Sequence, residues 1–233
     1  MGNPKHERGG YFVMELRDGL QARKTIRGFL LREVPKEIIT EILTDSIWAP
    51  SASNLQPWKY YVMTGEPLSS LRSKILDTHK ERKTSYNLSK PSTMPPEYFD
   101  RRKKLFKELI PFIRRLGDEN RAIIETGSLR FYDAPVVIFI SLNTNLHKNC
   151  LIDIGLSAEN LMLSAHEHGL GTCAVAFTLI YADVLKAALA VPEEDDIVLC
   201  IALGFPDDSF PLNEFRSSRE DMKTLVSWIG FGD

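Results

Sequence analysis

The feature that most constrains the fold is a nearly continuous apolar run, DAPVVIFISL, at residues 133–142. Such a run is typical of a strand that is buried on both faces, whereas a half-exposed strand alternates apolar and polar residues. A second run, DIVLCIALGFP at residues 196–206, predicts a final buried strand. The run WKYYVM, residues 58–63, is aromatic and β-branched enough for another strand, and the TGEP that follows it predicts a turn.

Apolar residues at helical spacing predict the helices that accompany these strands, at residues 11–21, 35–47, 69–76, 152–168 and 182–190. A further helical pattern lies in a polar, proline-bearing stretch, where Pro111 should kink or interrupt it. Because the buried strand at 133–142 resumes directly afterwards, this stretch is better explained as an excursion than as a linker. We therefore predict a single domain, residues 1–233, with a helical lid at about residues 77–125.

The charge balance and the cysteines exclude several classes of protein. The chain has 29 Lys and Arg against 31 Asp and Glu, so no overall positive field attracts nucleic acid or anionic membrane. No apolar run reaches the roughly 20 residues that span a bilayer, and the first residues lack the apolar core of a signal peptide. Cys150, Cys173 and Cys200 are widely spaced, as expected of reduced, buried thiols. We predict a cytoplasmic protein with no metal site and no membrane or nucleic-acid partner.

The stretch IWAPSASNLQPWKYYVM places several small polar residues directly before a strand. Pro, Ser and Asn are ordinary formers of surface turns, and this interpretation stays open. In the alternative, Ser51, Ser53, Asn54 and Gln56 direct their hydrogen-bonding groups at a polar ligand, because loops on a rigid scaffold often carry function.

A cationic connector, ARKTIRGF, holds Arg23, Lys24 and Arg27 beside Thr25, and Arg219 lies in the polar stretch near the C-terminus. The ordinary interpretation of such a segment is a solvated charge run. Two arginines with a hydroxyl are also what a phosphate dianion needs, because guanidinium groups form charge-assisted hydrogen bonds to its oxygens.

The segment GLGTCA, residues 169–174, formally satisfies the dinucleotide-binding pattern G-x-G-x-x-A. Its context argues against that function, because the pattern requires a preceding strand and here a long helix precedes it. The two glycines still leave backbone free to approach a flat ligand closely. The chain has no G-x-S-x-G, HExxH or paired-carboxylate motif, so no side chain is predicted to act as a catalytic acid, base or nucleophile. If the protein is an enzyme, a bound cofactor would carry the chemistry.

Five segments together resemble the FMN-dependent nitroreductase family over nearly the whole chain: RKTIRGF, APSASNLQPWKYYVM, DAPVVIFIS, DIGLSAENLMLSAHEHGLGT and IALGFP…N…R…R. The resemblance implies that Arg23, Thr25 and Arg219 hold the FMN phosphate and that Arg27 lies beside the flavin N1/C2 carbonyl. Since Arg216 is displaced by one position from the family's second basic residue, the phosphate should depend more on Arg23 and Lys24. The other flavin contacts that it implies come from the polar loop of a second subunit and from the GLGT region: Pro50, Ser51, Ala52, Asn54, Gln56, Gly171, Thr172 and Ala174.

The same resemblance implies an α+β fold of three layers, with a central mixed sheet flanked by helices. It implies an intertwined homodimer that exchanges its C-terminal tails, and the apolar residues 225–231 need such a burial site. The implied reaction is ping-pong hydride transfer from NADH or NADPH, through flavin N5, to a nitroaromatic, quinone or similar small aromatic acceptor. The same scaffold also resembles reductive dehalogenases and a flavin-fragmenting enzyme, which are alternative functions for this chain. A non-catalytic flavin-binding or storage protein is a further alternative.

Overall fold

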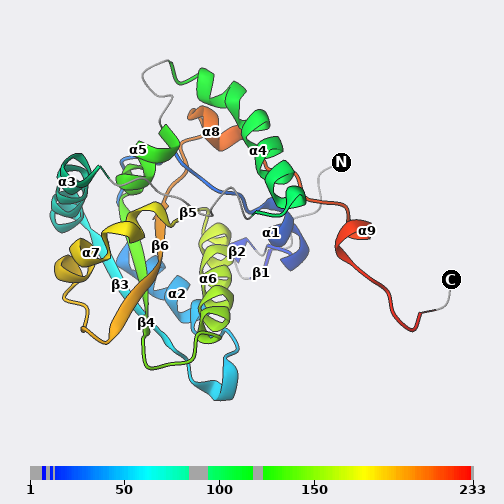
Figure 1. Ribbon diagram of the computed structural model, residues 1–233, viewed down its shortest axis with the longest axis horizontal. Helices are drawn as coiled ribbons and strands as arrows, with labels where there is room; N and C mark the ends of the chain where they lie inside the picture. The colour runs from blue at the N-terminus through cyan, green and yellow to red at the C-terminus, as the bar shows by residue number, and fades with distance from the viewer. Residues whose placement is uncertain (1–6, 9–10, 13, 84–93, 118–122, 232–233) are drawn as a thin grey trace.

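A four-stranded sheet forms the centre of the computed structural model, which describes residues 7–8, 11–12, 14–83, 94–117 and 123–231 (Figure 1). The strands, in their order across the sheet, are β3 (Trp58–Thr64), β4 (Val136–Asn143), β6 (Asp195–Gly204) and β5 (Gly171–Val175). Each neighbouring pair runs antiparallel. The four strands therefore form an antiparallel sheet. The parallel pairing among the described residues is an isolated bridge between Thr25 and Thr172, outside these strands, and the mixed character expected of the sheet is limited to that bridge.

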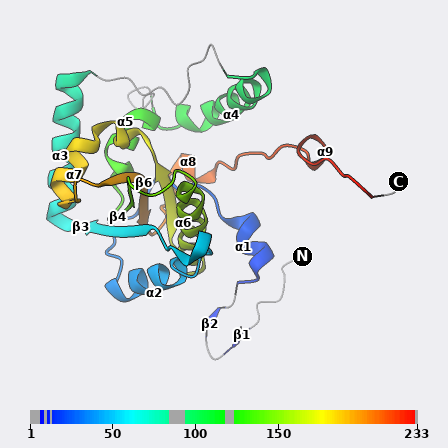
Figure 2. The same ribbon diagram turned by 60° about the horizontal axis from the view of Figure 1, so that its bottom comes forward.

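Helices cover both faces of the sheet and give the molecule three layers (Figures 1 and 2). One face packs against α3 (Gly65–Arg82), α5 (Ile123–Leu129) and α7 (Ala182–Leu189). The other packs against α2 (Lys36–Ser46) and α6 (Cys150–Glu167). The predicted helices at 35–47, 152–168 and 182–190 are thereby confirmed to within two residues.

Strand β4 shows why both faces are covered. Val137 and Phe139 pack into the core on the α3 side, whereas Val136 and Ile138 pack into the core on the α2 side. Adjacent residues of a strand point to opposite faces, so an unbroken apolar run has to be buried twice. The predicted buried strands at 133–142 and 196–206 are therefore confirmed.

All three cysteines are free and buried, as expected from their spacing. Burial raises the pKa of the Cys173 thiol to about 11 and that of Cys200 to about 12. Their thiolate forms are therefore scarce at neutral pH, and these side chains act as small apolar groups in the core.

Two predictions near the N-terminal half are wrong in their boundaries. The first helix, α1 (Leu16–Ala22), begins later than expected, because the short strands β1 (Glu7–Arg8) and β2 (Tyr11–Phe12) precede it. The TGEP segment is no turn: β3 ends at Thr64 and α3 begins at once. Pro67 lies in the first turn of α3, where its missing N–H lacks an intrahelical partner in any case.

The helix α4 (Pro96–Arg114) continues past Pro111, contrary to the interruption expected there. Leu109, on this helix, packs against Leu212 of the short helix α8 (Pro211–Glu214) in a separate cluster above the sheet. These contacts flank the proline on both sides and offset the roughly 3 kcal/mol that an interior proline costs a helix. Residues 84–93 and 118–122 lie outside the described residues, so the extent of the lid stays a prediction.

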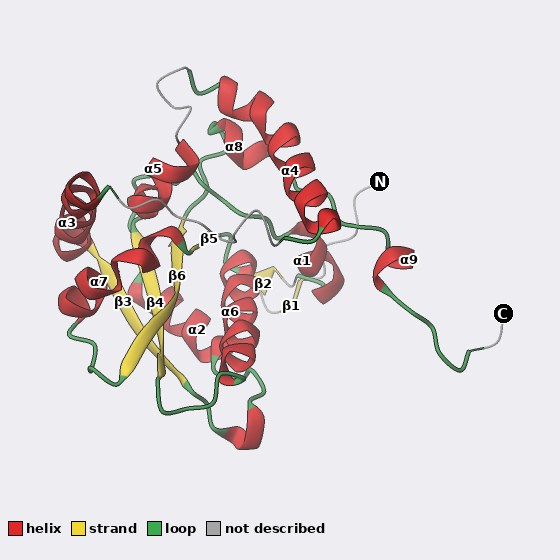
Figure 3. Cartoon of the chain, viewed as in Figure 1, coloured by secondary structure: helices red, strands yellow, loops and turns green. Residues whose placement is uncertain are grey.

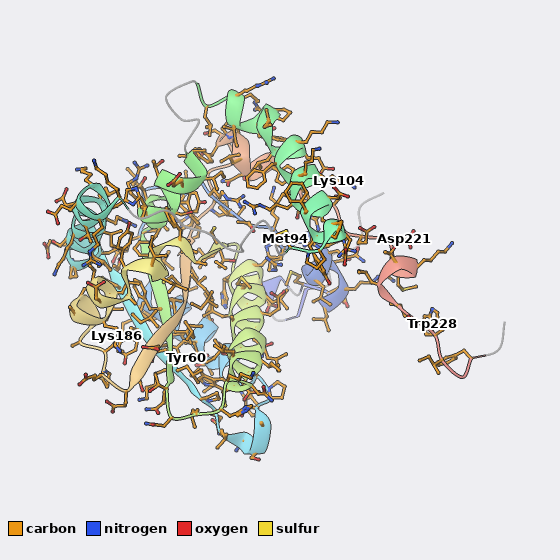
Figure 4. The ribbon with its side chains drawn as sticks, viewed as in Figure 1. Tyr60, Met94, Lys104, Lys186, Asp221 and Trp228 are labelled. Atoms are coloured by element: carbon orange, nitrogen blue, oxygen red, sulfur yellow. The ribbon has the colours of Figure 1, made fainter. Side chains whose placement is uncertain are left out.

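The C-terminal segment leaves the body of the molecule after α8 and projects away from it through α9 (Met222–Leu225), as Figures 1, 2 and 3 show. Its apolar side chains are largely exposed: Trp228 at 64% and Ile229 at 86% (Figure 4). None of the described helices combines the length and the apolar character needed to cross a membrane.

Candidate functional site

The cationic connector between α1 and α2 lies along the edge of the sheet, beside β5. Thr25 bridges to Thr172, and the backbone N–H of Ile26 donates to the carbonyl of Thr172 at 2.9 Å. Ile26 is buried, whereas its neighbours Thr25 and Arg27 are partly exposed. The extended backbone therefore turns one apolar side chain inward and leaves polar side chains toward the rim of the sheet.

Asn213, which is buried on α8, holds the connector through side-chain hydrogen bonds to its backbone. Its Oδ1 accepts from the backbone N–H groups of Arg27 at 2.7 Å and Gly28 at 3.1 Å, and its Nδ2 donates to the carbonyl of Gly28 at 2.7 Å. Lys24 donates from its Nζ to the backbone carbonyl of Asn213. The sequence around Asn213 gives no sign of this role, because its partners lie about 185 residues away in the chain.

A cavity of about 340 Å³ opens beside the connector, and four cations line it with no carboxylate among the lining residues. The connector contributes Arg23, Lys24 and Thr25, and the C-terminal segment contributes Arg216, Ser217 and Arg219. The structure thus brings together residues nearly 200 positions apart that the resemblance assigned to a phosphate. It also adds Arg216, which the displaced spacing had led sequence reasoning to discount.

A second cavity, of about 170 Å³, adjoins the first and shares Arg23 and Lys24 with it. Gly171, Thr172 and His166 lie on its other sides. Arg23 also contacts the helix α6, where its Nε lies 3.2 Å from Glu159 Oε1. Two of the predicted residues of the GLGT region therefore lie next to the cationic connector.

His166 contributes little positive charge to this site near neutral pH. Burial, followed by the positive charges of Arg23 and Arg216, lowers its pKa below the ordinary value of 6.5. Arginine and lysine supply the positive charge of the site.

Arg27 lies apart from both cavities. Its guanidinium carbon is 5.8 Å from the centroid of the Tyr132 ring. Its Nε is buried and has no hydrogen-bond partner among the described residues. A buried donor without a partner costs free energy, so it is available to an acceptor that a ligand would bring.

The polar loop before β3 lies at the opposite end of α6 from the connector (Figure 1). The backbone N–H of Ala52 donates to Oδ2 of Asp153, in the first turn of α6, at 3.4 Å. His166, beside the connector, lies 13 residues further along that helix, which corresponds to about 20 Å. Within one protomer, the structure therefore does not bring the predicted loop residues to the predicted phosphate residues.

The loop has an unusual conformation. Ser53, Asn54 and Gln56 all have positive φ, at 52°, 55° and 47°. The Oγ of Ser51 accepts from the backbone N–H of Gln56 at 3.0 Å, and the Nε2 of Gln56 donates to Oδ1 of Asn54 at 3.1 Å. Left-handed backbone in non-glycine residues is strained and is concentrated at functional sites. Pro50, Ala52, Asn54 and Gln56 are exposed, so the loop offers its polar groups outward.

Gly171 and Ala174 of the GLGT region have different surroundings. A Cβ placed on Gly171 would lie 2.6 Å from the side chain of Ile26, so the close approach that this glycine permits is to the connector and not to a ligand. Ala174 is exposed on β5 and lines neither cavity. Among the described residues, no group of three or more His, Cys, Asp or Glu side chains is arranged to hold a metal ion.

The chain is similar to known proteins over most of its length. The sequence model of the Nitroreductase family matches residues 20–205. The chain is 30% identical to a 4-nitrobenzoate reductase of Pseudomonas putida, covering 90% of this chain and 93% of that protein. It is 29% identical to a nitrobenzene nitroreductase of Ectopseudomonas oleovorans, covering 91% and 96%. Among solved structures it is similar to the FMN-dependent nitroreductase NfnB of Mycobacterium smegmatis in complex with NADPH, with a TM-score of 0.83, 27% identity, and coverage of 91% and 97%.

Proposed function

The chain belongs to the nitroreductase family, and we propose that it is an FMN-dependent enzyme that carries electrons from NADPH or NADH to a nitroaromatic or quinone acceptor. The relative from Pseudomonas putida is a 4-nitrobenzoate reductase and that from Ectopseudomonas oleovorans a nitrobenzene nitroreductase, which supports a nitroaromatic acceptor. The similar NfnB structure is FMN-dependent and contains NADPH, which supports the cofactor and the donor.

The observation that carries this proposal is the cavity lined by Arg23, Lys24, Arg216 and Arg219 without any carboxylate. Arg23 is paired with Glu159 of α6, whereas Lys24, Arg216 and Arg219 have no ion pair among the described residues. Cations that face one space repel one another unless an anion joins them, and a phosphate dianion satisfies several guanidinium groups at once. The hydroxyls of Thr25 and Ser217 line the same cavity and can donate to the remaining phosphate oxygens. These residues fit the phosphate end of FMN.

Arg27 fits the ring end of the same cofactor. Its positively charged group lies apart from the phosphate cavity, and its Nε has no partner among the described residues. A cation held close to the flavin N1 edge favours electron uptake by the ring, because two unit charges about 4 Å apart attract by roughly 4 kcal/mol at an effective dielectric of 20. When bound, FMN would take a hydride from the nicotinamide and pass its electrons on to the acceptor.

The proposal includes a homodimer, because one protomer does not assemble the whole site. The strained polar loop lies about 20 Å along α6 from the connector. The outer face of α6 exposes Leu151, Ile152 and Leu156, and the projecting tail exposes Trp228 and Ile229. A second protomer would bury these side chains, bring its own loop to the connector, and exclude water from the flavin. Obligate interfaces of this kind bury more than about 2,000 Å².

The visible spectrum of the purified protein tests the proposed function. We expect flavin absorption that bleaches when NADPH or NADH is added without oxygen and returns when 4-nitrobenzoate follows. A colourless protein that does not take up added FMN would refute the proposal. A yellow protein that neither nucleotide bleaches would favour a flavin-binding or storage function.

Sedimentation at low micromolar concentration tests the dimer separately. We expect a flavin-loaded species of twice the chain mass. A folded monomer that retains flavin would show that the partner loop is not needed for cofactor binding.

A further inference from the structure

A third cavity, of about 300 Å³, lies between α4 and the C-terminal segment. Arg101, Arg102 and Lys104 of α4 line it on one side, and residues 217–220 line it on the other. Figure 4 shows Lys104 on α4 and Asp221 at the start of α9, just beyond that segment. The basic run on α4 has no part in the proposed cofactor site, so the cavity requires its own explanation.

The cavity adjoins the proposed phosphate site of FMN. Ser217 and Arg219 line both cavities, so a single stretch of the C-terminal segment forms the wall between them. Arg101 Nε lies 2.9 Å from Glu220 Oε2, an ion pair that ties α4 to this stretch. The two cavities are therefore neighbours that share one stretch of the C-terminal segment.

The charges of the cavity favour an anion. Its lining has four cations, Arg101, Arg102, Lys104 and Arg219, against two carboxylates, Glu108 and Glu220. Arg101 neutralises Glu220 directly, and this hydrogen bond lowers the pKa of Glu220. Arg219 is already engaged by the proposed FMN phosphate, and neither Arg102 nor Lys104 forms an ion pair with a carboxylate of the described residues, so these two cations face the cavity beside one further carboxylate, Glu108. A phosphomonoester carries about −1.5 to −2 at pH 7, and its oxygens can accept hydrogen bonds from both side chains.

From this arrangement we infer that the cavity between α4 and residues 217–220 binds the 2′-phosphate of NADPH and selects NADPH over NADH. The inference rests on the proposed function, in which a nicotinamide dinucleotide is the electron donor. NADPH differs from NADH only in this phosphomonoester, and arginine is the usual residue that accommodates it. The hydroxyl of Ser218, at the same cavity, adds a donor to the phosphate oxygens.

Steady-state kinetics of a matched pair of variants test the inference. The double variant Arg102→Gln, Lys104→Gln removes two charges from the cavity. The control, Lys103→Gln, Lys107→Gln, removes two charges from the same helix at positions that do not line the cavity. We expect the ratio of kcat/KM for NADPH to that for NADH to fall at least tenfold in the first variant and to stay near the wild-type value in the control. Equal loss of preference in both variants would reduce the effect to the general charge of α4 and refute the inference.

A binding measurement that does not depend on turnover complements the kinetics. Calorimetric titration of the flavin-loaded protein with adenosine 2′,5′-bisphosphate should show at least tenfold weaker binding to the Arg102→Gln, Lys104→Gln variant than to the wild type. Adenosine 5′-monophosphate, which lacks the 2′-phosphate, should bind more weakly and without this difference. Equal affinities of the wild type for the two nucleotides would overturn the assignment of the cavity.

The failure of this inference can be told apart from the failure of the proposed function. A yellow protein that NADPH and NADH bleach equally well would refute the 2′-phosphate site and leave the flavoenzyme intact. A protein that binds no flavin would refute both.

Discussion

The two ends of β6 carry two polar regions that are built in opposite ways. At its first residue, Asp195 is fully buried and accepts from Lys59 at 2.7 Å, Asn143 at 2.9 Å and Ser141 at 3.3 Å. At its last residue, Gly204 pairs with Gly171, next to the connector whose cations face a cavity without carboxylates. In the first region the charge of Asp195 is balanced by partners within the chain, whereas the second region has an excess of positive charge.

The pKa of Asp195 reflects these hydrogen-bonding partners. Burial opposes ionisation, but hydrogen bonds from Lys59 and Asn143 outweigh it and lower the pKa of the carboxyl below its ordinary value. A polar group whose partners are all in its own chain stabilises the fold. Cations that lack such partners indicate a ligand. Five predictions test this contrast, in order of decreasing effect.

Replacing Asp195 with Asn should destabilise the protein by about 2 kcal/mol, because it breaks a charge-assisted network in the core while Lys59, 54% exposed, can return to water. Urea unfolding measures the change. The neighbour Asp196 pairs with Lys186 at the surface, and Asp196→Asn should cost only about 0–1 kcal/mol. Equal losses in the two variants would mean that the buried network stabilises the fold no more than the surface ion pair does.

The pH dependence of the same pair follows from the lowered pKa of Asp195. A carboxyl with a native pKa below its unfolded value of about 3.9 contributes stability above that value and loses it as the pH falls through the native pKa. The difference in stability between wild type and Asp195→Asn should therefore be constant near neutral pH and shrink in acid.

Replacing Arg23 or Arg219 with Ala should weaken FMN binding at least tenfold, since each removes a charge-assisted contact worth about 1.5–3 kcal/mol. The stability of the flavin-free protein should change little in Arg219→Ala, whereas Arg23→Ala also loses the ion pair of Arg23 with Glu159 and should cost up to about 1 kcal/mol. Fluorescence titration of flavin measures the affinity, with Arg82→Ala as a control in a surface ion pair with Asp183. Unchanged flavin affinity in both variants would place the phosphate elsewhere.

Replacing Arg27 with Gln should leave flavin affinity nearly unchanged, lower the reduction potential of the bound flavin, and slow its bleaching by NADPH about tenfold. That rate change corresponds to about 1.4 kcal/mol, less than the unscreened charge interaction because water and the phosphate screen the site. Anaerobic stopped-flow absorbance and a redox titration give the two values. If both matched the wild type, Arg27 would be a structural residue beside Tyr132.

His166 gives the smallest effect. Because burial and the nearby arginines lower its pKa in the folded protein, the unfolded chain binds the proton more readily, and stability falls as the pH drops below about 6.5. Between pH 7 and pH 5.5 the Tm of the flavin-free wild type should fall more than that of His166→Gln. Saturating FMN should reduce this difference, since a phosphate nearby favours the protonated imidazole.

Local pattern was sufficient for the elements whose periodicity matches their burial. The apolar run at 133–142 and the spacing over 152–168 predicted β4 and α6, because each sequence admits only one way to hide its apolar side chains. Pattern was insufficient where a breaker residue was involved. At Pro111 the helix continues because Leu212, distant in sequence, packs against it, and no local window contains that residue. At Pro67 the helix has begun two residues earlier, so the proline lies in its first turn and breaks no hydrogen bond.

The site divides in the same way. The sequence showed which residue types occur in the connector and in the polar loop. The cations of the connector already suggested an anionic ligand. Only the tertiary structure brought Arg216 and Arg219 to Arg23, showed Asn213 holding the connector, and placed the loop at the far end of α6. The reason is physical: charge and hydrogen-bonding capacity belong to single residues, whereas an excess of charge in one cavity depends on which distant segments the folded chain brings together.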